Sequence, residues 1–323
     1  MSTKVQLPTT LKGKTILVAG AAGFVPSTLC EFYLNLDAKV IGLDNFITGS
    51  KSNIDILEKY ENFTFHECNI YEKLPDFTGV DIDYVFSLAS PASPIDFGLI
   101  PMEIMRVNSE GTLALLELSL EKKARFLEAS TSEVYGDPEI HPQTEDYVGH
   151  VNTLGPRGCY DESKRFAEAM TMSFHRKFGL DTRIIRIFNT YGPRMRPNDG
   201  RVIPNFINQA MRNEDITVYG DGSQTRSFCF VTDLVDAIHN VMFSDDPTPF
   251  NCGNPDEYTI LDTAKFIIKA LDSKSKIVFL DLPKDDPKRR RPDLTKLQSV
   301  SDFSPKVSFE EGIKRTTEFF KSL

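Results

Sequence analysis

The chain has 323 residues, of which 40% are hydrophobic and 26% are charged, so it is long enough for one large domain and a smaller companion. Its 46 Asp and Glu residues outnumber its 37 Lys and Arg residues, and the net charge of −9 argues against a surface that binds nucleic acid. Five scattered cysteines lack the spacing of metal ligands, and no apolar run reaches the roughly 18 residues of a membrane span. We therefore expect a soluble cytoplasmic protein with reduced thiols, no metal site, and no nucleic-acid or membrane partner.

The first predicted elements are a strand, a glycine turn and a helix. Residues 15–19 are apolar and of strand type, Gly20 and Gly23 follow them, and a helical pattern runs from 24 to about 36. The glycines allow a tight turn in which backbone amides approach the pyrophosphate of a dinucleotide; a purely structural turn is the alternative. The third position of the usual glycine pattern is Pro26, which a first helical turn tolerates because its missing N–H would be unpaired there.

The next strand, residues 39–43, ends in Asp44, about twenty residues after the glycines. An acidic group at this place meets the ribose hydroxyls of a dinucleotide, and an acid in place of an arginine favours NAD over NADP. Further strands are predicted at 63–66, 84–88, 125–129 and 182–188, with helices chiefly at 101–121 and 160–178. This alternation indicates an α/β fold with a doubly wound, Rossmann-like parallel sheet, which binds ligands at the carboxyl ends of its strands.

The alternation of strands and helices stops after Tyr191. Turn-forming residues at 192–200 and 220–222 indicate a second lobe, and residues 228–243 have the pattern of a strand and a helix that return to the first domain. We predict an NAD-binding domain at 1–190 plus about 227–250, and a smaller, mostly helical substrate lobe at about 191–226 and 251–323.

The strongest chemical signal is the segment with Thr131 and Glu133, followed about thirty residues later by Tyr160 and Lys164. Residues four apart share a helix face, so an ammonium beside the phenol would lower the phenol's pKa. Such a phenol can take a proton from an alcohol while hydride leaves the same carbon, and Thr131 can hydrogen-bond that alcohol. Glu133 adds an acid–base group that alcohol oxidation does not need, which indicates chemistry after the oxidation. Chance spacing on a surface helix and a surface carboxylate are the alternatives.

Two arginines, Arg226 and Arg290, are candidates for binding a diphosphate or a carboxylate, because guanidinium geometry suits both anions. Solvated surface cations are the alternative. Cys159 is interpreted as a packed thiol, since no histidine partner for a nucleophile is evident near it.

These motifs together resemble the extended short-chain dehydrogenase/reductase superfamily that acts on nucleotide sugars, and within it the UDP-glucuronate decarboxylases, also called UDP-xylose synthases. The matching stretches are spread over nearly the whole chain, at 88–94, 130–138, 155–165, 186–195, 199–206, 219–228 and 289–293. Related 4,6-dehydratases usually carry Thr-Asp-Glu where this chain has Thr131-Ser132-Glu133, and epimerases usually lack the glutamate. The chain departs from the family at Pro26, at Asn69 where an adenine-binding Asp is usual, and at Val148 where a Trp is common.

The resemblance implies NAD-dependent oxidative decarboxylation of UDP-glucuronate to UDP-xylose through a UDP-4-keto intermediate, with NAD recycled, in a homodimer packed through the helices beginning near 102 and 160. The implied catalytic residues are Thr131, Glu133, Tyr160, Lys164 and Arg226. The implied cofactor contacts are Gly20, Gly23, Phe24, Asp44, Asn45, Asn69, Ile70, Leu88, Ala89, Ser90, Asn108, Tyr160 and Lys164. The implied substrate contacts are Pro94, Ser132, Asn189, Arg194, Val202, Asn205, Tyr219, Gln224, Arg226 and Arg290.

Two other functions fit parts of the pattern. A nucleotide-sugar 4,6-dehydratase or 4-epimerase would use the same fold, and the identity of the product separates these enzymes from a decarboxylase. A non-catalytic NAD-binding sensor is motivated by Pro26 and Asn69, but a binding module has no use for the base at Tyr160.

Overall fold

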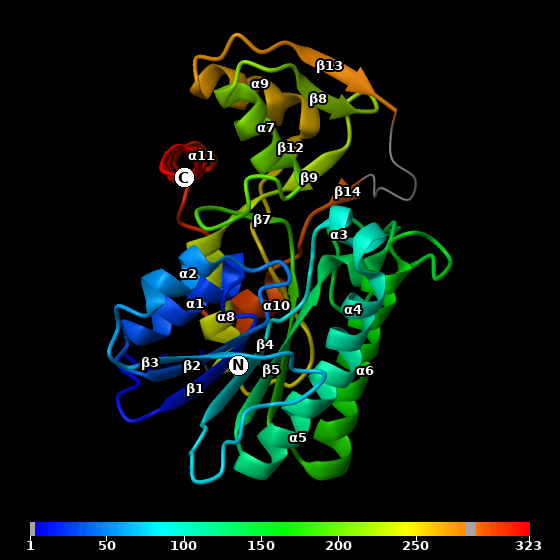
Figure 1. Cartoon of the computed structure of the whole chain (residues 1–323). Coiled ribbons are helices and arrows are strands. Elements are labelled where there is room, and N and C mark those ends of the chain that lie inside the picture. The colour runs from blue at the N-terminus through cyan, green and yellow to red at the C-terminus, as the bar shows by residue number, and fades with distance from the viewer. Residues whose placement is uncertain (1–3, 282–288) are drawn as a thin grey trace.

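A seven-stranded parallel sheet forms the lower part of the molecule in the computed structural model, which describes residues 4–281 and 289–323 (Figure 1). The strand order is β11-β6-β5-β4-β1-β2-β3. These strands are β1 Thr15–Ala19, β2 Lys39–Asp44, β3 Phe63–Glu67, β4 Tyr84–Ser87, β5 Arg125–Thr131, β6 Thr182–Ile187 and β11 Phe250–Cys252. The order reverses between β1 and β4, where such sheets open a crevice for ligands. The predicted doubly wound, Rossmann-like sheet is confirmed.

Helices cover both faces of this sheet (Figure 1). One face packs against α1 Phe24–Leu34, α2 Lys51–Leu57, α8 Val231–Met242 and α10 Thr295–Val300. The other packs against α5 Thr112–Lys122 and α6 Gly158–Phe178, with α4 Pro101–Arg106 on α6. The helix predicted at 101–121 is interrupted by a π-helical segment, Val107–Gly111, which divides α4 from α5.

Strand β5 shows the two faces directly. Leu127 and Ala129 pack in the core under α1 and α8, whereas Phe126 packs in the core under α5 and α6. Because side chains alternate along a strand, Glu128 and Ser130 lie on the same side as Phe126, toward α6. This strand is therefore polar on one face although it is central in the sheet.

The upper lobe has its own hydrophobic core, which includes Ile207, Val218, Ile267 and Ile313. Its helices are α7 Val202–Met211, α9 Ile260–Ala270 and α11 Phe309–Lys321. Its small sheets pair β8 Ile216–Tyr219 with β13 Ile277–Leu280, β9 Thr225–Ser227 with β12 Glu257–Thr259 and β14 Arg289–Arg290, and β7 Thr190–Tyr191 with β10 Cys229–Phe230. Short strands thus accompany the predicted helices.

Two later segments join the lower part of the molecule. Phe250 on β11 and Leu297 on α10 are buried in the core of the seven-stranded sheet. The predicted division of the chain into domains stays a prediction. Within residues 4–281 and 289–323, no helix has both the length and the apolar composition needed to cross a membrane.

Candidate active site

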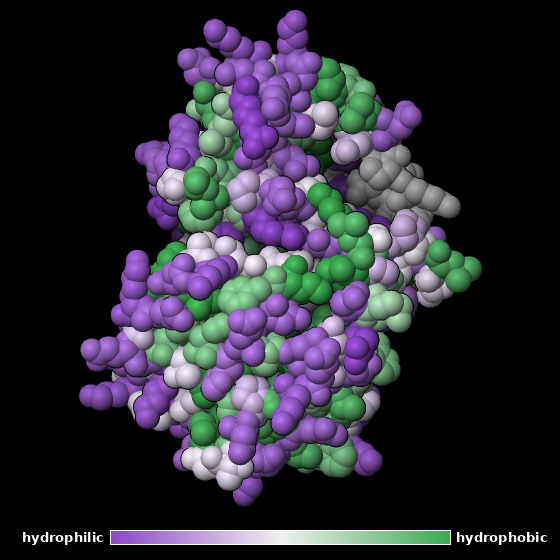
Figure 2. Space-filling view, viewed as in Figure 1, coloured by the Kyte–Doolittle hydropathy of each residue, from purple (hydrophilic) through white to green (hydrophobic). Residues whose placement is uncertain are grey.

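A cavity of about 590 Å³ lies between the carboxyl ends of the sheet strands and the upper lobe. In the space-filling view a waist separates the two parts of the molecule (Figure 2). With one exception, the predicted site residues line this cavity: Gly20, Gly23, Phe24, Asp44, Asn45, Asn69, Ile70, Leu88, Ala89, Ser90, Pro94, Thr131, Ser132, Glu133, Tyr160, Lys164, Asn189, Arg194, Val202, Asn205, Tyr219, Gln224, Arg226 and Arg290. The exception is Asn108, which lies buried in the π-helical segment with its side-chain amide donating to Ser163 Oγ at 3.0 Å.

The glycine turn after β1 is built for close backbone approach. Gly20 has a φ of +87°, and a Cβ added there would lie 2.9 Å from the Cα of Ala89. The amide of Gly23 donates to the Gly20 carbonyl at 2.8 Å, and α1 begins directly after Gly23 without a side-chain cap. Pro26 is buried in the first turn of α1, the part of a helix where its missing N–H costs least. This helix end can therefore present backbone amides to a pyrophosphate.

Asp44 hydrogen-bonds the backbone of the same turn through its side chain. Its Oδ2 accepts a hydrogen bond from the amide of Ala22 at 3.0 Å, and its Oδ1 accepts one from the amide of Phe46 at 2.7 Å. Burial raises the pKa of this carboxyl group, and the hydrogen bonds from the backbone act in the opposite direction. The turn and the acid lie at the ends of neighbouring strands, β1 and β2, as a dinucleotide site requires.

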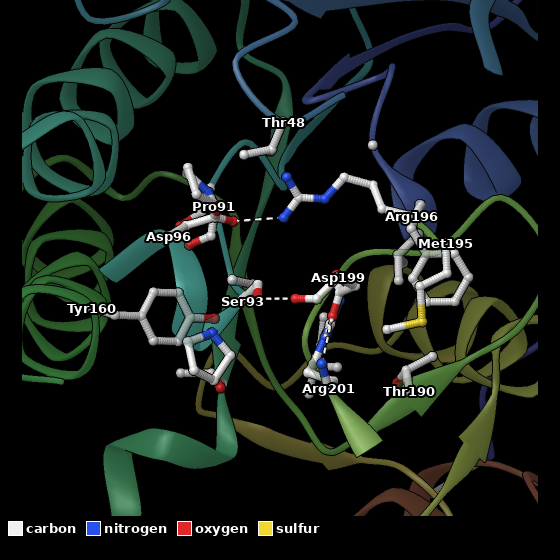
Figure 3. Close-up of a pocket in the computed structure, with 18 of the residues that line it drawn as sticks. Thr48, Pro91, Ser93, Asp96, Tyr160, Thr190, Met195, Arg196, Asp199 and Arg201 are labelled. Atoms are coloured by element: carbon white, nitrogen blue, oxygen red, sulfur yellow. Dashed lines mark hydrogen bonds and ion pairs between the residues drawn. The ribbon is translucent and has the colours of Figure 1, made fainter. Parts of the chain in front are cut away.

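Tyr160 projects from α6 into the cavity and is 6% exposed (Figure 3). Its ring stacks on Phe97 with centroids 5.0 Å apart. Burial raises the pKa of its phenol, while the hydrogen bond from the Thr131 side chain acts in the opposite direction. The three residues thus place a hydroxyl and a phenol in one apolar corner of the cavity.

The pKa of Tyr160 is raised, whereas its spacing with Lys164 predicted a lowered value. The Lys164 ammonium donates to the carbonyl of Ala129 at 2.7 Å and to Glu128 Oε1 at 3.3 Å, so it is directed toward β5. The two side chains do share a helix face and line one cavity, as predicted. The prediction of a lowered pKa for Tyr160 is wrong here because burial outweighs the nearby charges.

Glu133 lies in a single helical turn, Ser132–Tyr135, that follows β5, and its side chain is 16% exposed. Arg290 donates to its Oε1 at 2.7 Å, and Arg157 donates to its Oε2. Burial alone would raise the pKa of Glu133, but the charges of Arg290 and Arg157 outweigh it and the pKa is lowered. Glu133 is therefore held as a carboxylate. The pKa of nearby Asp161 is raised, chiefly by burial and next by the negative charge of Glu133.

The two arginines proposed for anion binding are neighbours. Arg226 on β9 pairs in register with Arg290 on β14, and both side chains are buried. Arg226 also donates to the carbonyl of Thr225 at 2.8 Å. Together with Arg157 they make this wall of the cavity cation-rich, with Glu133 as the acidic partner. The surface-cation alternative does not hold for these two side chains.

Sequence reasoning missed the polar residues at the mouth of the cavity (Figure 3). Arg196 donates to Asp96 at 2.7 Å, and the guanidinium of Arg201 binds Asp199 through Nε at 2.5 Å and Nη2 at 2.8 Å. Ser93 donates to the carbonyl of Asp199. These contacts tie the loop before α7 to α3, Pro94–Leu99, and to the residue before it. The partners Arg196 and Asp96, and Ser93 and Asp199, are about a hundred residues apart in sequence, so no local motif indicates these two contacts.

The guanidinium of Arg194, a predicted substrate contact, is bound to residues of α1. Arg194 lines the cavity, but its guanidinium donates to Glu31 Oε2 at 2.5 Å and to the carbonyl of Ser27 at 3.0 Å, both on α1. Its backbone has a φ of +72°, which is uncommon for a residue other than glycine. This side chain therefore joins the loop before α7 to the cofactor half of the molecule.

The chain matches the model of the NAD dependent epimerase/dehydratase family over residues 16–253. UDP-glucuronic acid decarboxylase 1 of Danio rerio is 47% identical over 307 residues, which cover 95% of this chain and 72% of the relative. UDP-glucuronic acid decarboxylase 2 of Arabidopsis thaliana is 44% identical over 318 residues, which cover 98% of this chain and 71% of the relative.

Two solved structures show the same likeness in three dimensions. UDP-glucose 4-epimerase of Thermotoga maritima has a TM-score of 0.87 at 29% identity and covers 95% of this chain and 99% of its own. UDP-glucuronic acid 4-epimerase of Bacillus cereus, solved with UDP-glucuronic acid and NAD, has a TM-score of 0.86 at 29% identity with the same coverage. These matches confirm the predicted superfamily and its NAD cofactor. The chain belongs to the NAD dependent epimerase/dehydratase family.

Proposed function

We propose that this protein converts UDP-glucuronate to UDP-xylose and carbon dioxide, with NAD as a cofactor that is regenerated in each turnover. The curated relatives with 43–47% identity that are named UDP-glucuronic acid decarboxylases support this proposal. The structural observation that carries it is a single cavity lined by Thr131, Tyr160 and Lys164 together with Glu133, a carboxylate held by arginines. An alcohol dehydrogenase would need the first three residues but not the fourth.

The residues around the first strand fit NAD. Gly20 has no room for a side chain, and Asp44 ends β2, where an acidic residue would hydrogen-bond the ribose of the dinucleotide. Bound NAD⁺ would take a hydride from C4 of the sugar and return it to the same carbon after carbon dioxide has left. Asn69, Ile70, Leu88, Ala89 and Ser90 line the cavity beside this turn and are proposed cofactor contacts.

Tyr160 is the proposed base that removes the proton of the sugar's 4-hydroxyl group, with Thr131 as its hydrogen-bonding partner. Positive charge must oppose the effect of burial on the phenol's pKa, and Arg201 does so in this structure. Oxidation at C4 makes the sugar a β-keto acid. The bond between C5 and the carboxylate carbon then breaks, its electron pair enters the C4 carbonyl as an enolate, and C5 takes up a proton.

Glu133 and Arg226 are proposed to act on the sugar during decarboxylation. Because Arg290 and Arg157 keep Glu133 ionised, it contributes as a carboxylate that orients the sugar and its proton donor. The cations of this wall stabilise the negative charge that develops on the enolate and bind the diphosphate. Other proposed substrate contacts in the cavity lining are Pro94, Ser132, Asn189, Arg194, Val202, Asn205, Tyr219, Gln224 and Arg290.

We also propose a homodimer packed through α4, α5 and α6. The support is a group of exposed apolar side chains on these helices, including Met102, which is 62% exposed, and Phe166, which is 52% exposed. Replacing both with glutamate should convert the dimer to a monomer in sedimentation experiments. A cytoplasmic location is proposed from the five cysteines, which are free thiols in this structure.

The second candidate is a 4-epimerase acting on the same substrate. It is favoured by the structural likeness to UDP-glucuronic acid 4-epimerase of Bacillus cereus. Proton NMR of the purified protein mixed with UDP-glucuronate, with and without added NAD⁺, separates the two. UDP-xylose is the expected product, whereas a six-carbon epimer without carbon dioxide would establish the epimerase. Unchanged substrate would favour a different nucleotide sugar or a sensor.

A further inference from the structure

Glu128 is a glutamate buried in the middle of β5, and its carboxyl group contacts the proposed catalytic residue Lys164. It is 0% exposed, and its neighbours Leu127 and Ala129 are apolar core residues. Glutamate is almost never fully buried without a partner, since removal of a charge from water costs several kcal/mol. Its position on the α6 side of the sheet brings it to Lys164.

The contact between Glu128 and Lys164 uses one oxygen of the carboxyl group and one of the three donors of the ammonium group. Lys164 Nζ lies 3.3 Å from Oε1 of Glu128 and 2.7 Å from the carbonyl of Ala129. An ammonium has three donors, so one remains for the cavity that Lys164 lines. Oε2 of Glu128 is buried and, among the described residues, has no hydrogen-bond partner. The carboxyl group of Glu128 therefore contacts the Lys164 ammonium from the β5 side.

The other charged groups on this side of the sheet are already paired. Glu168 on α6 accepts two hydrogen bonds from Arg186 on β6 and one from Ser130 on β5. On β4, Ser87 lies opposite Glu128 in register. Burial raises the pKa of Glu128, Lys164 and Ser87 act in the opposite direction, and Glu168 adds to the increase. Lys164 is thus the cation that determines whether Glu128 is ionised.

We propose that Glu128 is a positioning residue for Lys164: its carboxylate holds the ammonium against β5 and offsets part of the positive charge that the lysine presents to Tyr160. The inference rests on the proposed function, in which Tyr160 takes a proton from the 4-hydroxyl group and later returns it. A base with both tasks works best when its pKa matches the working pH, so the size of each charge's effect on the phenol matters. Glu128 limits how far Lys164 lowers that pKa.

The test is the Glu128→Gln variant, which keeps the shape of the side chain and removes its charge. In the NAD-loaded protein with ¹³C-labelled tyrosine, the Tyr160 resonance is assigned by its absence from Tyr160→Phe. The expected result is ionisation of Tyr160 at a pH about 0.5 to 1 unit lower than in the unmodified protein. The acidic limb of the pH profile of kcat/KM for UDP-xylose formation should move in the same direction.

Two further variants keep the test decisive. Glu168→Gln removes a half-buried carboxylate on α6 that pairs with Arg186 and not with Lys164, and it should move the Tyr160 titration by less than half as much. Glu128→Leu should reproduce the effect of Glu128→Gln if the amide variant does not fold. An unchanged or higher titration pH in a folded Glu128 variant would overturn the inference. If no UDP-xylose forms, the proposed function fails while the NMR titration still decides the role of Glu128.

Discussion

Two glutamates near the proposed catalytic residues have opposite pKa shifts: Glu128 contacts Lys164, and Glu133 lies close enough to Tyr160 to affect its pKa. Glu128, in the middle of β5 on the side that faces α6, is fully buried beside one lysine, and its Oε2 has no hydrogen-bond partner among the described residues. Glu133, in the turn that follows β5, accepts hydrogen bonds from Arg290 and Arg157. The pKa of Glu128 is raised and that of Glu133 is lowered. Burial pushes both upward, so the number and contact of the cations decide the difference.

This contrast assigns different tasks to the two acids. Glu133 stays ionised next to the sugar site, where a fixed negative charge can orient a substrate and its proton donor. Glu128 is remote from the sugar site and acts only through Lys164. Tyr160, Lys164 and the arginines of the cation-rich wall line the same cavity.

The largest expected effect comes from removing the phenol of the proposed base itself. Tyr160→Phe should lower UDP-xylose formation by about 10³-fold or more, because proton transfer to a positioned side chain is lost. The affinity for UDP, measured by calorimetry, should stay unchanged because the phenol is proposed to act on the sugar and not on the nucleotide. Full activity in this variant would remove Tyr160 from its assigned role.

Glu133→Gln tests the carboxylate held by the arginines. It leaves Arg290 and Arg157 without their acidic partner, so kcat/KM should fall by about 10²-fold. Initial rates measured by chromatography of UDP-xylose check this. The control is Glu139→Gln, which changes an exposed carboxylate with a 67% accessible side chain and should leave the rate as it is. Equal rates in both variants would contradict the proposed role.

Asp44→Asn examines a third buried carboxylate, one satisfied by backbone amides instead of cations. The amide group offers one oxygen where the carboxylate offers two, so NAD affinity should weaken by about tenfold. Fluorescence titration with NADH measures the dissociation constant. Asp55→Asn, an exposed position on α2, is the matched control. The prediction fails if the two variants bind NADH equally well.

The pH dependence of stability should have opposite signs for the two carboxylates. Glu133 has a lowered pKa, so its stabilising effect is present above the usual value of 4.5 and is lost as pH falls through its folded pKa. Glu128 has a raised pKa, so the protein loses stability as pH rises from 4.5 through its folded pKa. Urea unfolding of both Gln variants and the unmodified protein, repeated across this pH range, measures the two differences in stability. Curves that diverge in the same direction would contradict this assignment.

The smallest expected effect is at Pro26. Because this proline occupies the first turn of α1, where its N–H would have no partner in the helix, Pro26→Ala should change the NADH dissociation constant by less than about threefold. A larger change in the same fluorescence titration would show that Pro26 determines the cofactor affinity of the glycine turn.

The sequence predicted the parts of this site that depend on local pattern. The glycine turn, Asp44 at the end of β2 and the shared helix face of Tyr160 and Lys164 follow from short spacings and from apolar runs of strand type. The direction of the Lys164 ammonium does not follow from helix spacing, because it depends on Glu128 across the packed layer. A glutamate within the strand pattern at 125–129 was the signal that could have indicated this contact.

Other contacts depend on tertiary structure alone. Arg157 and Glu133 meet only when α6 packs beside β5, and Asp96 meets Arg196 only when the loop before α7 folds over α3. The π-helical segment between α4 and α5 could not be predicted from the apolar periodicity either, because it is only a local change in hydrogen bonding. Long-range pairs of this kind have no fixed spacing in a sequence.

The most direct test of the central claim uses UDP-glucuronate that carries deuterium at C4 and ¹³C in the carboxylate. Oxidation and reduction at C4 in one site predict UDP-xylose that retains the deuterium, one labelled carbon dioxide for each product, and one solvent-derived hydrogen at C5. An epimerised six-carbon product with its ¹³C retained would contradict the account, as would UDP-xylose that has lost the deuterium from C4.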